Sequence, residues 1–549
     1  MRPRWWLLGA LVGLGLAACA GPPVGDASPA ALGDPATDSP SEWTGETRLV
    51  PQGYPTIQAA VDAAEPGDLV LIDRGVYREE VQVTTPGLII RGIDRNEVII
   101  DGELQRPNGI EVFFADGVAI ENLTVRNATG NGVFWTGVRG FRGSYLTALD
   151  NQDYGIYAFD SSDGLLEFSY AFGSPDAGFY IGQCDPCQST LTDSISEWNG
   201  LGFSGTNASS DLYIVKSVFR YNLSGIGPNT LDGELLPPFH GVNVVGNLVH
   251  DNGNEDAPAK ALQWAAQGNG IMLSGGGDSY VSRNRVFNHP QSGIIVLPMI
   301  DANVYMSYDH HVEGNVVAGS GLADLTLGGP SASGNCFEGN EYSSTLPAAL
   351  ELKQPCEGLR LPALFEFGSS TAQLGRLFES GLDLRPEFDP AAMPDPQPQP
   401  NMPGGADAPV VPAVNVFAGS EPDLDSIAVP EMPPGSEVTQ ERGINIMGVS
   451  LASAAGVFFG LYAYILPLVL YTSWVVIAIW DLSRREDSNR GKVIGWMAVI
   501  LIIPFVGVIA YYLFGRSSIP VWQRWVFLAG GMAVYALFLG LGMVVGGIV

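Results

Sequence analysis

A glycine followed by an apolar residue recurs at a nearly constant step through the middle of the chain. The repeated pairs are Gly132-Val133, Gly155-Ile156, Gly178-Phe179, Gly202-Phe203, Gly225-Ile226, Gly270-Ile271 and Gly293-Ile294, separated by 23, 23, 24, 23, 45 and 23 residues. Asparagines precede many of these glycines, at Asn127, Asn151, Asn199, Asn222 and Asn288. A constant step of this size predicts one coil of a β-solenoid per repeat, with glycine at a crowded position and asparagine side chains stacked in a hydrogen-bonded ladder.

The long step of 45 residues predicts projecting loops. It contains two polar segments, residues 228–240 and 252–267, on either side of a strand-like alternation over residues 241–250. Either one coil bears two long loops, or two coils are present and one has an irregular turn. Loops on a rigid scaffold are common places for function.

Order begins with a helical pattern over residues 55–64, with Thr56 placed as its N-cap. Short strands are expected at residues 69–72, 81–83, 88–90 and 98–100, separated by turn residues. The segment PTIQAAVDAAEPGDLVLIDRGVYREEVQV resembles the N-terminal cap and first coils of pectate-lyase-like proteins. The repeats also resemble those of the exported β-helix protein of nitrous oxide reductase copper maturation. These resemblances imply a right-handed parallel β-helix, which we place at residues 46–356.

The first residues predict export. Arg2 and Arg4 precede a short apolar run that ends in Leu-Ala-Ala-Cys19, so residues 1–19 read as a signal peptide. This ending resembles the bacterial lipobox, which implies lipidation of Cys19; an ordinary signal peptide is the alternative. Residues 20–45 are rich in Pro, Gly, Ala and Ser and predict a flexible tether.

Four further cysteines are expected to form two disulfides in an exported protein. Three pairings exist, and Cys184–Cys187 with Cys336–Cys356 is the local choice. A redox-active or metal-binding Cys-Asp-Pro-Cys motif is the alternative, although Pro186 favours a tight turn.

The C-terminal part predicts a membrane anchor. Residues 357–441 are rich in Pro and acidic residues and read as a linker, and residues 442–549 contain about three apolar stretches, near 462–480, 493–514 and 525–545. The basic loop with Arg484, Arg485, Arg490 and Lys492 is expected to be cytoplasmic, which places the β-helix outside the cell membrane. The segment from Trp480 to Pro520 resembles the N-terminal membrane module of phospholipase-D-type enzymes. Their His-x-Lys pattern is missing, so their chemistry is not implied.

Charge limits the partners. Asp and Glu number 58 against 27 Lys and Arg, giving a net charge of −31. An acidic surface repels phosphate backbones, so we expect no nucleic-acid partner.

Aromatic side chains predict a sugar-binding face. The residue after each repeated glycine should face inward, and the next one outward, which gives Phe134, Tyr157 and Tyr180 on adjacent coils. Rings at the interstrand spacing of ~4.8 Å could stack on successive sugars; the alternative is a ladder that only stabilises the solenoid. Gln183 and Asn207 belong to a polar row beside the rings and are further candidate ligand-binding residues.

Acidic and basic residues near this face are candidates for catalysis: Asp160, Asp232, Glu234, His240 and Lys260. Paired carboxylates would suit a hydrolase, whereas a cation such as calcium with a Lys or Arg base would suit a polysaccharide lyase or epimerase. Exposed acids that are merely solvated are the alternative.

A third hypothesis is copper binding by Met299, Met306, His310 and His311, whose thioether and imidazole groups are soft ligands. Adjacent histidines in a strand point to opposite faces, which argues against a shared site. The leading functional prediction is therefore binding, with or without processing, of an envelope or extracellular polysaccharide. The alternatives are a non-catalytic scaffold that docks a membrane complex, and delivery of copper or another metal to an exported enzyme.

Overall fold

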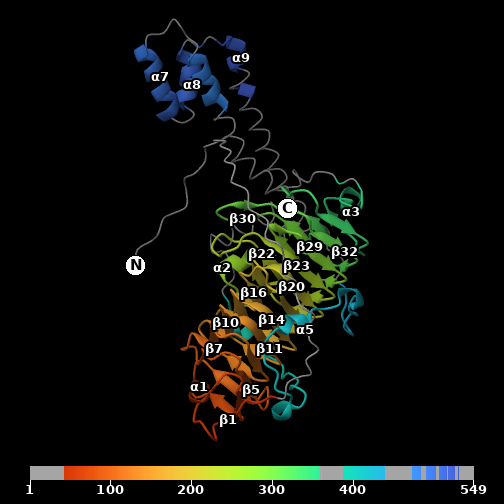
Figure 1. Cartoon of the computed structure of the whole chain (residues 1–549). Coiled ribbons are helices and arrows are strands. Elements are labelled where there is room, and N and C mark those ends of the chain that lie inside the picture. Colours follow the sequence, from red (N-terminus) through yellow and green to blue (C-terminus); the bar gives the residue numbers. More distant parts are fainter. Residues whose placement is uncertain are drawn as a thin grey trace, which may run out of the picture. The chain divides into compact units, whose positions relative to one another are not determined.

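The computed structural model describes residues 43–358, 360, 388–438, 473–483, 490–502, 506–515, 517, 519–525 and 529–530. The predicted signal peptide, Cys19 and most of the tether lie outside these residues. From Thr47 onward the chain winds through three parallel sheets in turn, one strand of each per regular coil. The architecture is the predicted parallel β-helix (Figure 1).

Sheet 1 has 11 strands and carries the repeated glycines. Its strands are β4 (Val81–Val83), β7 (Asn108–Phe113), β10 (Asn131–Thr136), β13 (Tyr154–Phe159), β16 (Ala177–Gly182), β19 (Leu201–Thr206), β22 (Ser224–Asn229), β25 (Ile271–Ser274), β29 (Ser292–Leu297), β34 (Ala323–Leu327) and β36 (Thr345–Leu346).

Sheet 2 has 13 strands and follows sheet 1 in each regular coil. Its strands are β1 (Thr47–Val50), β2 (Leu69–Ile72), β5 (Ile89–Gly92), β8 (Val118–Glu121), β11 (Arg139–Ser144), β14 (Ser162–Glu167), β17 (Ser189–Thr192), β20 (Ser209–Val215), β23 (Phe239–Val245), β26 (Gly276–Gly277), β27 (Tyr280–Ser282), β32 (His311–Glu313) and β35 (Cys336–Glu338).

Sheet 3 has 10 short strands. They are β3 (Gly75–Tyr77), β6 (Val98–Asp101), β9 (Thr124–Arg126), β12 (Thr147–Leu149), β15 (Tyr170–Phe172), β18 (Ile195–Glu197), β21 (Val218–Arg220), β24 (Leu248–His250), β28 (Arg285–Phe287) and β33 (Val316–Ala318).

The repeated glycines stack because no side chain fits between the coils. A Cβ atom on Gly132 would lie 2.5 Å from the carbonyl oxygen of Gly155, and one on Gly202 would lie 2.6 Å from that of Gly225. The residues after them pair from coil to coil and are buried in the core: Val133, Ile156, Phe179, Phe203, Ile226, Ile271 and Ile294. The predicted inward-facing positions are therefore confirmed.

Asparagine ladders add hydrogen bonds along the axis. Asn199 Nδ2 donates to Asn222 Oδ1 at 3.1 Å, and Asn222 Nδ2 donates to Asn252 Oδ1 at 3.0 Å. The predicted Asn127 and Asn288 instead bind aspartates. A second ladder, not predicted, runs through Asn247, Asn284, Asn315 and Asn340.

Both ends of the solenoid are closed. At the start, helix α1 (Ile57–Asp62) buries Ile57 and Val61, and Thr56 Oγ1 caps it by accepting from the Ala59 N–H. At the far end, helix α3 (Leu350–Lys353) buries Leu350. The Cys336–Cys356 and Cys184–Cys187 disulfides form as predicted.

Residues 388–438, which we call the strap, lie along the β-helix instead of forming a free spacer. They contain the short helices η1 (Pro390–Ala392), η2 (Gly405–Asp407), α5 (Val416–Ser420) and η3 (Leu424–Ser426). Arginines of the β-helix donate to strap carbonyls: Arg91 to Ala408 at 2.7 Å, Arg283 to Leu424 at 2.7 Å and Arg285 to Pro430 at 2.6 Å. An extended, proline-rich segment leaves carbonyls unpaired, and these become the docking groups.

The C-terminal segment is helical where it is described. Residues 473–483 are helical, followed by α7 (Arg490–Ile502), α8 (Val506–Phe514) and α9 (Val521–Trp525). Their apolar residues form one cluster, and the Tyr511 hydroxyl donates to Asp481 at 2.6 Å. Within the described residues, no helix has the length and apolar character needed to cross a membrane. Much of the predicted first and third spans lies outside those residues.

Candidate functional site

The predicted aromatic row forms on the outer face of sheet 1. Phe134, Tyr157 and Tyr180 pair in register on β10, β13 and β16. The Phe134 and Tyr157 rings stack with centroids 4.7 Å apart, and Tyr154, which sequence reasoning missed, stacks on Tyr157 at 4.2 Å. Phe134, Tyr154 and Tyr157 are partly exposed. Tyr180 is fully buried, so the prediction of an exposed ring is wrong for this residue.

Tyr180 is buried because residues 230–238 fold back toward it. We call this segment the first loop. Asn207 Nδ2 donates to the carbonyls of Leu231 and Leu235 at 2.8 and 3.0 Å, and Gln183 Oε1 accepts from the Leu235 N–H at 2.9 Å. Gln183 and Asn207, two of the predicted ligand-binding residues, thus use their amides to hold the loop.

The first loop brings Glu234 to the aromatic row. The Tyr180 hydroxyl donates to Glu234 Oε2 at 2.6 Å. Burial raises the pKa of Glu234 to about 7, the Tyr180 hydrogen bond opposes this rise, and the charge of Asp176 adds to it. A carboxyl group with this pKa exchanges protons near neutral pH, as a general acid requires.

Residues 252–267, the second loop, contain helix α2 (Ala261–Trp264) and lie at the starts of the sheet 1 strands, where the Lys260 N–H donates to the Pro175 carbonyl at 3.1 Å. Lys260 Nζ pairs with Asp153 and lies 3.0 Å from Asp176 Oδ2. Gln263 Nε2 donates to Asp176 Oδ1 at 2.6 Å. Burial raises the pKa of Asp176 to about 6, although Lys260 opposes the rise.

Both loops belong to one coil. Ile226 of β22 pairs directly with Ile271 of β25, so the 45-residue step is a single coil with two long loops. The loops bring together Glu234, Asp153, Asp176 and Lys260 beside the tyrosines, an arrangement that we call the loop cluster. Asp153 and Asp176 were not predicted, yet each precedes a repeated glycine by two residues in adjacent coils. That shared position was the signal for them.

The other candidate catalytic residues lie elsewhere or have structural partners. Asp160 is exposed in the turn after β13. His240 lies in sheet 2 on β23, with Nε2 3.6 Å from Asp185. Asp232 accepts from the Asn303 N–H at 2.8 Å and the Tyr305 hydroxyl at 2.6 Å, which lowers its pKa and anchors the hairpin of β30 (Met299–Ile300) and β31 (Val304–Tyr305).

The copper candidates do not form one ligand set. His310 is buried against Phe239, with ring centroids 5.8 Å apart, and burial lowers its pKa to about 3. His311 is partly exposed, and its Nδ1 lies 3.0 Å from Glu313. Met299 lies in β30, and Met306 follows β31 with an exposed side chain. The His311 and Glu313 ligand atoms lie within 4.8 Å of Cys336 and Cys356, but these cysteines are joined in a disulfide.

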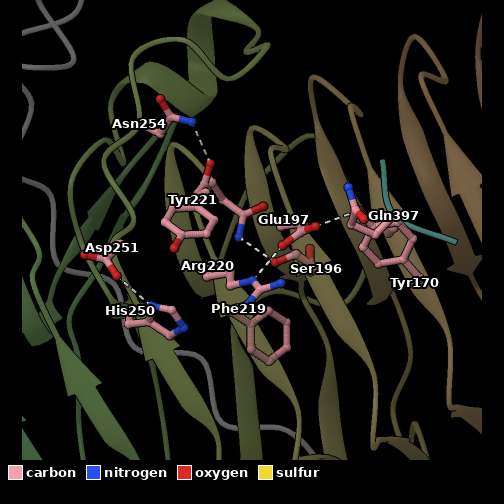
Figure 2. Close-up of polar contacts among 12 residues, drawn as sticks. Tyr170, Ser196, Glu197, Phe219, Arg220, Tyr221, His250, Asp251, Asn254 and Gln397 are labelled. Carbon is pink, nitrogen blue, oxygen red and sulfur yellow. Dashed lines mark hydrogen bonds and ion pairs between the residues drawn. The ribbon is translucent and has the colours of Figure 1, made fainter. Parts of the chain in front are cut away.

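A second polar cluster lies on sheet 3, where the strap passes (Figure 2). Glu197 accepts from the Tyr170 hydroxyl and from Arg220 Nε, both at 2.6 Å, and the backbone of Gln397 in the strap binds Tyr170. Arg220 is therefore held by Glu197, and this cluster serves to attach the strap.

Comparisons with known proteins concern two parts of the chain. Residues 474–516 match the family model described as Phospholipase D-nuclease N-terminal. The match covers that segment alone. It confirms the resemblance noted for the C-terminal part, and no curated protein matches the chain in sequence.

Solved β-helix structures are similar in fold. The A-module of mannuronan C-5 epimerase AlgE4 from Azotobacter vinelandii is 15% identical, with a TM-score of 0.38, over 52% of this chain and 90% of that one. Pectate lyase Pel9A is 14% identical (TM-score 0.32; 55% and 75% covered), and the periplasmic alginate epimerase AlgG is 12% identical (TM-score 0.32; 54% and 83% covered). At these identities the similarity concerns the fold.

Proposed function

We propose that the β-helix binds a linear polysaccharide along the outer face of sheet 1, beside the loop cluster. The observation that carries the proposal is the set of stacked rings of Phe134, Tyr157 and Tyr154, partly exposed next to Glu234. The faces of these rings stack on one another, so ring edges and the tyrosine hydroxyls line the surface that would contact the sugars. Phe134 and Tyr157 lie on adjacent coils, and the strand-to-strand spacing of ~4.8 Å is about the length of a sugar unit.

We place this site outside the cell membrane. The signal-like start and the lipobox-like Cys19 would anchor the N-terminal end. The apolar stretches in residues 442–549 would anchor the other end, with the basic loop inside. Two disulfides fit an oxidising compartment.

We extend the proposal to cleavage of the bound polymer. Glu234, with its raised pKa, would donate a proton to the leaving glycosidic oxygen while water attacks the anomeric carbon. Asp176, across the tyrosines, is the carboxylate that would take the proton of that water.

Binding is tested by calorimetry on the full-length chain in mild detergent, with hexasaccharides of neutral, amino and uronic sugars. Tyr157→Ala should weaken binding of the preferred hexasaccharide about two- to tenfold, because a ring contact is worth roughly 0.5–1.5 kcal/mol. Phe168→Ala is the matched control: it removes a ring stacked on Tyr145 at 4.9 Å outside sheet 1. Equal losses in the two variants, or binding of none of the sugars, would refute the proposal.

Cleavage is tested by release of new reducing ends from the polymer that binds. Glu234→Gln should abolish release while the β-helix keeps its circular dichroism spectrum. Release at an unchanged rate would exclude Glu234 as the acid, and no release by the unaltered chain would make the protein a polysaccharide-binding protein without turnover.

A further inference from the structure

The face that bears the aromatic row is lined mainly by acids. At one end, Glu111 of β7 pairs in register with Phe134, and Glu80 lies close enough for the two charges to interact. At the other end are Asp153, Asp176 and Glu234. Nearby bases include Arg78 and Arg106, which both pair with Glu103, and Lys260, which is shared by two aspartates.

These acids also raise the pKa values of neighbouring groups. Burial and the charges of Glu234, Asp153 and Asp176 all raise the pKa of Tyr157. Burial and the charge of Glu111 raise the pKa of Glu80. A bound carboxylate would enter a field that already opposes the ionisation of the protein's own acids.

Lys260 shows what this surface accepts. Its ammonium group lies 5.7 Å from the centre of the Tyr154 ring and binds Asp153 and Asp176. An ammonium group over a tyrosine face, paired with carboxylates, combines cation–π attraction with charge-assisted hydrogen bonds. The surface beside it continues with the same elements, namely Tyr157, Phe134 and Glu111.

We propose that the polymer bound on sheet 1 is an amino-sugar polysaccharide with free ammonium groups, not a polyuronate. This inference rests on the proposed function and adds the substrate class. Sugar rings lie against the exposed edges of Tyr157 and Phe134, while ammonium groups of the polymer pair with Glu111 at one end and with the acids of the loop cluster at the other. A polyuronate would bring like charges to both ends.

The test is calorimetry on the full-length chain in mild detergent at low ionic strength, with three hexasaccharides: fully deacetylated β-1,4-glucosamine, its N-acetylated form and an oligouronate. The deacetylated hexamer should bind at least about tenfold more tightly than the acetylated one. Its ammonium groups form ion pairs with the acids at the two ends of the face, and the acetylated form cannot make these pairs. Glu111→Gln should remove about threefold or more of this preference. Among the described residues the Glu111 side chain takes part in no hydrogen bond or ion pair, so we expect this variant to keep the strand pairing of β7 and the fold. Glu338→Gln, an exposed acid on sheet 2, is the matched control and should leave the preference unchanged.

Each outcome decides something. Equal or tighter binding of the acetylated hexamer or of the oligouronate, with a loss in Tyr157→Ala, overturns the amino-sugar inference and leaves the proposed function standing. An equal effect of Glu338→Gln and Glu111→Gln overturns the inference too, because the preference is then a property of the overall charge. Binding of none of the three overturns the proposed function and this inference together.

Discussion

Replacing Gly202 by alanine should destabilise the β-helix at a defined place. The new Cβ would lie 2.6 Å from the Gly225 carbonyl oxygen, 2.9 Å from Phe219 and 3.0 Å from the Asn222 amide, whereas ordinary contacts begin at 3.4 Å. The next coil must therefore move by about 0.8 Å. The overpacking costs roughly 1–3 kcal/mol, and the weakened hydrogen bond of the asparagine ladder costs roughly 1 kcal/mol more. The expected loss is about 2–4 kcal/mol, or a Tm lower by about 5 °C or more.

The assay is thermal and urea unfolding followed by far-ultraviolet circular dichroism. Gly233→Ala is the matched control, because a Cβ there meets nothing within 4 Å. We expect Gly233→Ala to unfold like the unaltered chain and Gly202→Ala to unfold earlier. If the two variants unfold together, the coils do not stack closely at Gly202, and the reasoning that links the glycine repeat to this fold is wrong.

Three further predictions concern charge, the strap and the closing disulfide. The pKa of Glu234 is raised from 4.5 to about 7, so the folded state holds this proton more tightly than the unfolded chain, and the free energy of unfolding should fall as the pH rises from about 5 to 7. Glu234→Gln should flatten this pH dependence in urea titrations. An identical slope in the variant would contradict the assignment. Arg91→Met removes the donor to strap carbonyls and one partner of buried Glu121, so it should lower the free energy of unfolding by about 3–5 kcal/mol and speed proteolysis within residues 397–437. Arg74→Met, which breaks an exposed ion pair, is the control and should have neither effect. Replacing Cys336 and Cys356 by serine should lower stability by about 3 kcal/mol, since their bond closes a 20-residue segment; unchanged unfolding would show that it does not hold the end.

The sequence predicts the coils well because their determinants repeat. Each glycine is required by contact with the same position one coil later, so Gly132 and Gly202 report equivalent geometry. The same alternation places Phe134 and Tyr157 on the outside. Tyr180 has the same repeat position but is buried, because a loop that interrupts the repeat covers it.

Contacts made by the irregular segments could not be read from the repeat. Lys260 reaches Asp153 and Asp176, which precede it by 107 and 84 residues, through a loop with no periodic pattern. The strap binds through backbone carbonyl groups, which every residue has, and through the scattered apolar residues Phe417 and Ile427, so no periodic pattern predicted its docking. Asp153, Asp176 and Glu234 come together only through such long-range contacts, so the acidic character of this face was not predicted from the sequence.

Hydrogen–deuterium exchange of the full-length chain, with and without the hexasaccharide that binds most tightly, tests most directly where the polymer lies. The account predicts slower exchange on binding in residues 131–136 and 154–159 and in the two loops at 230–238 and 252–267. Slower exchange confined to sheet 3 or to the strap would contradict it, because the polymer would then lie on a face without the aromatic row.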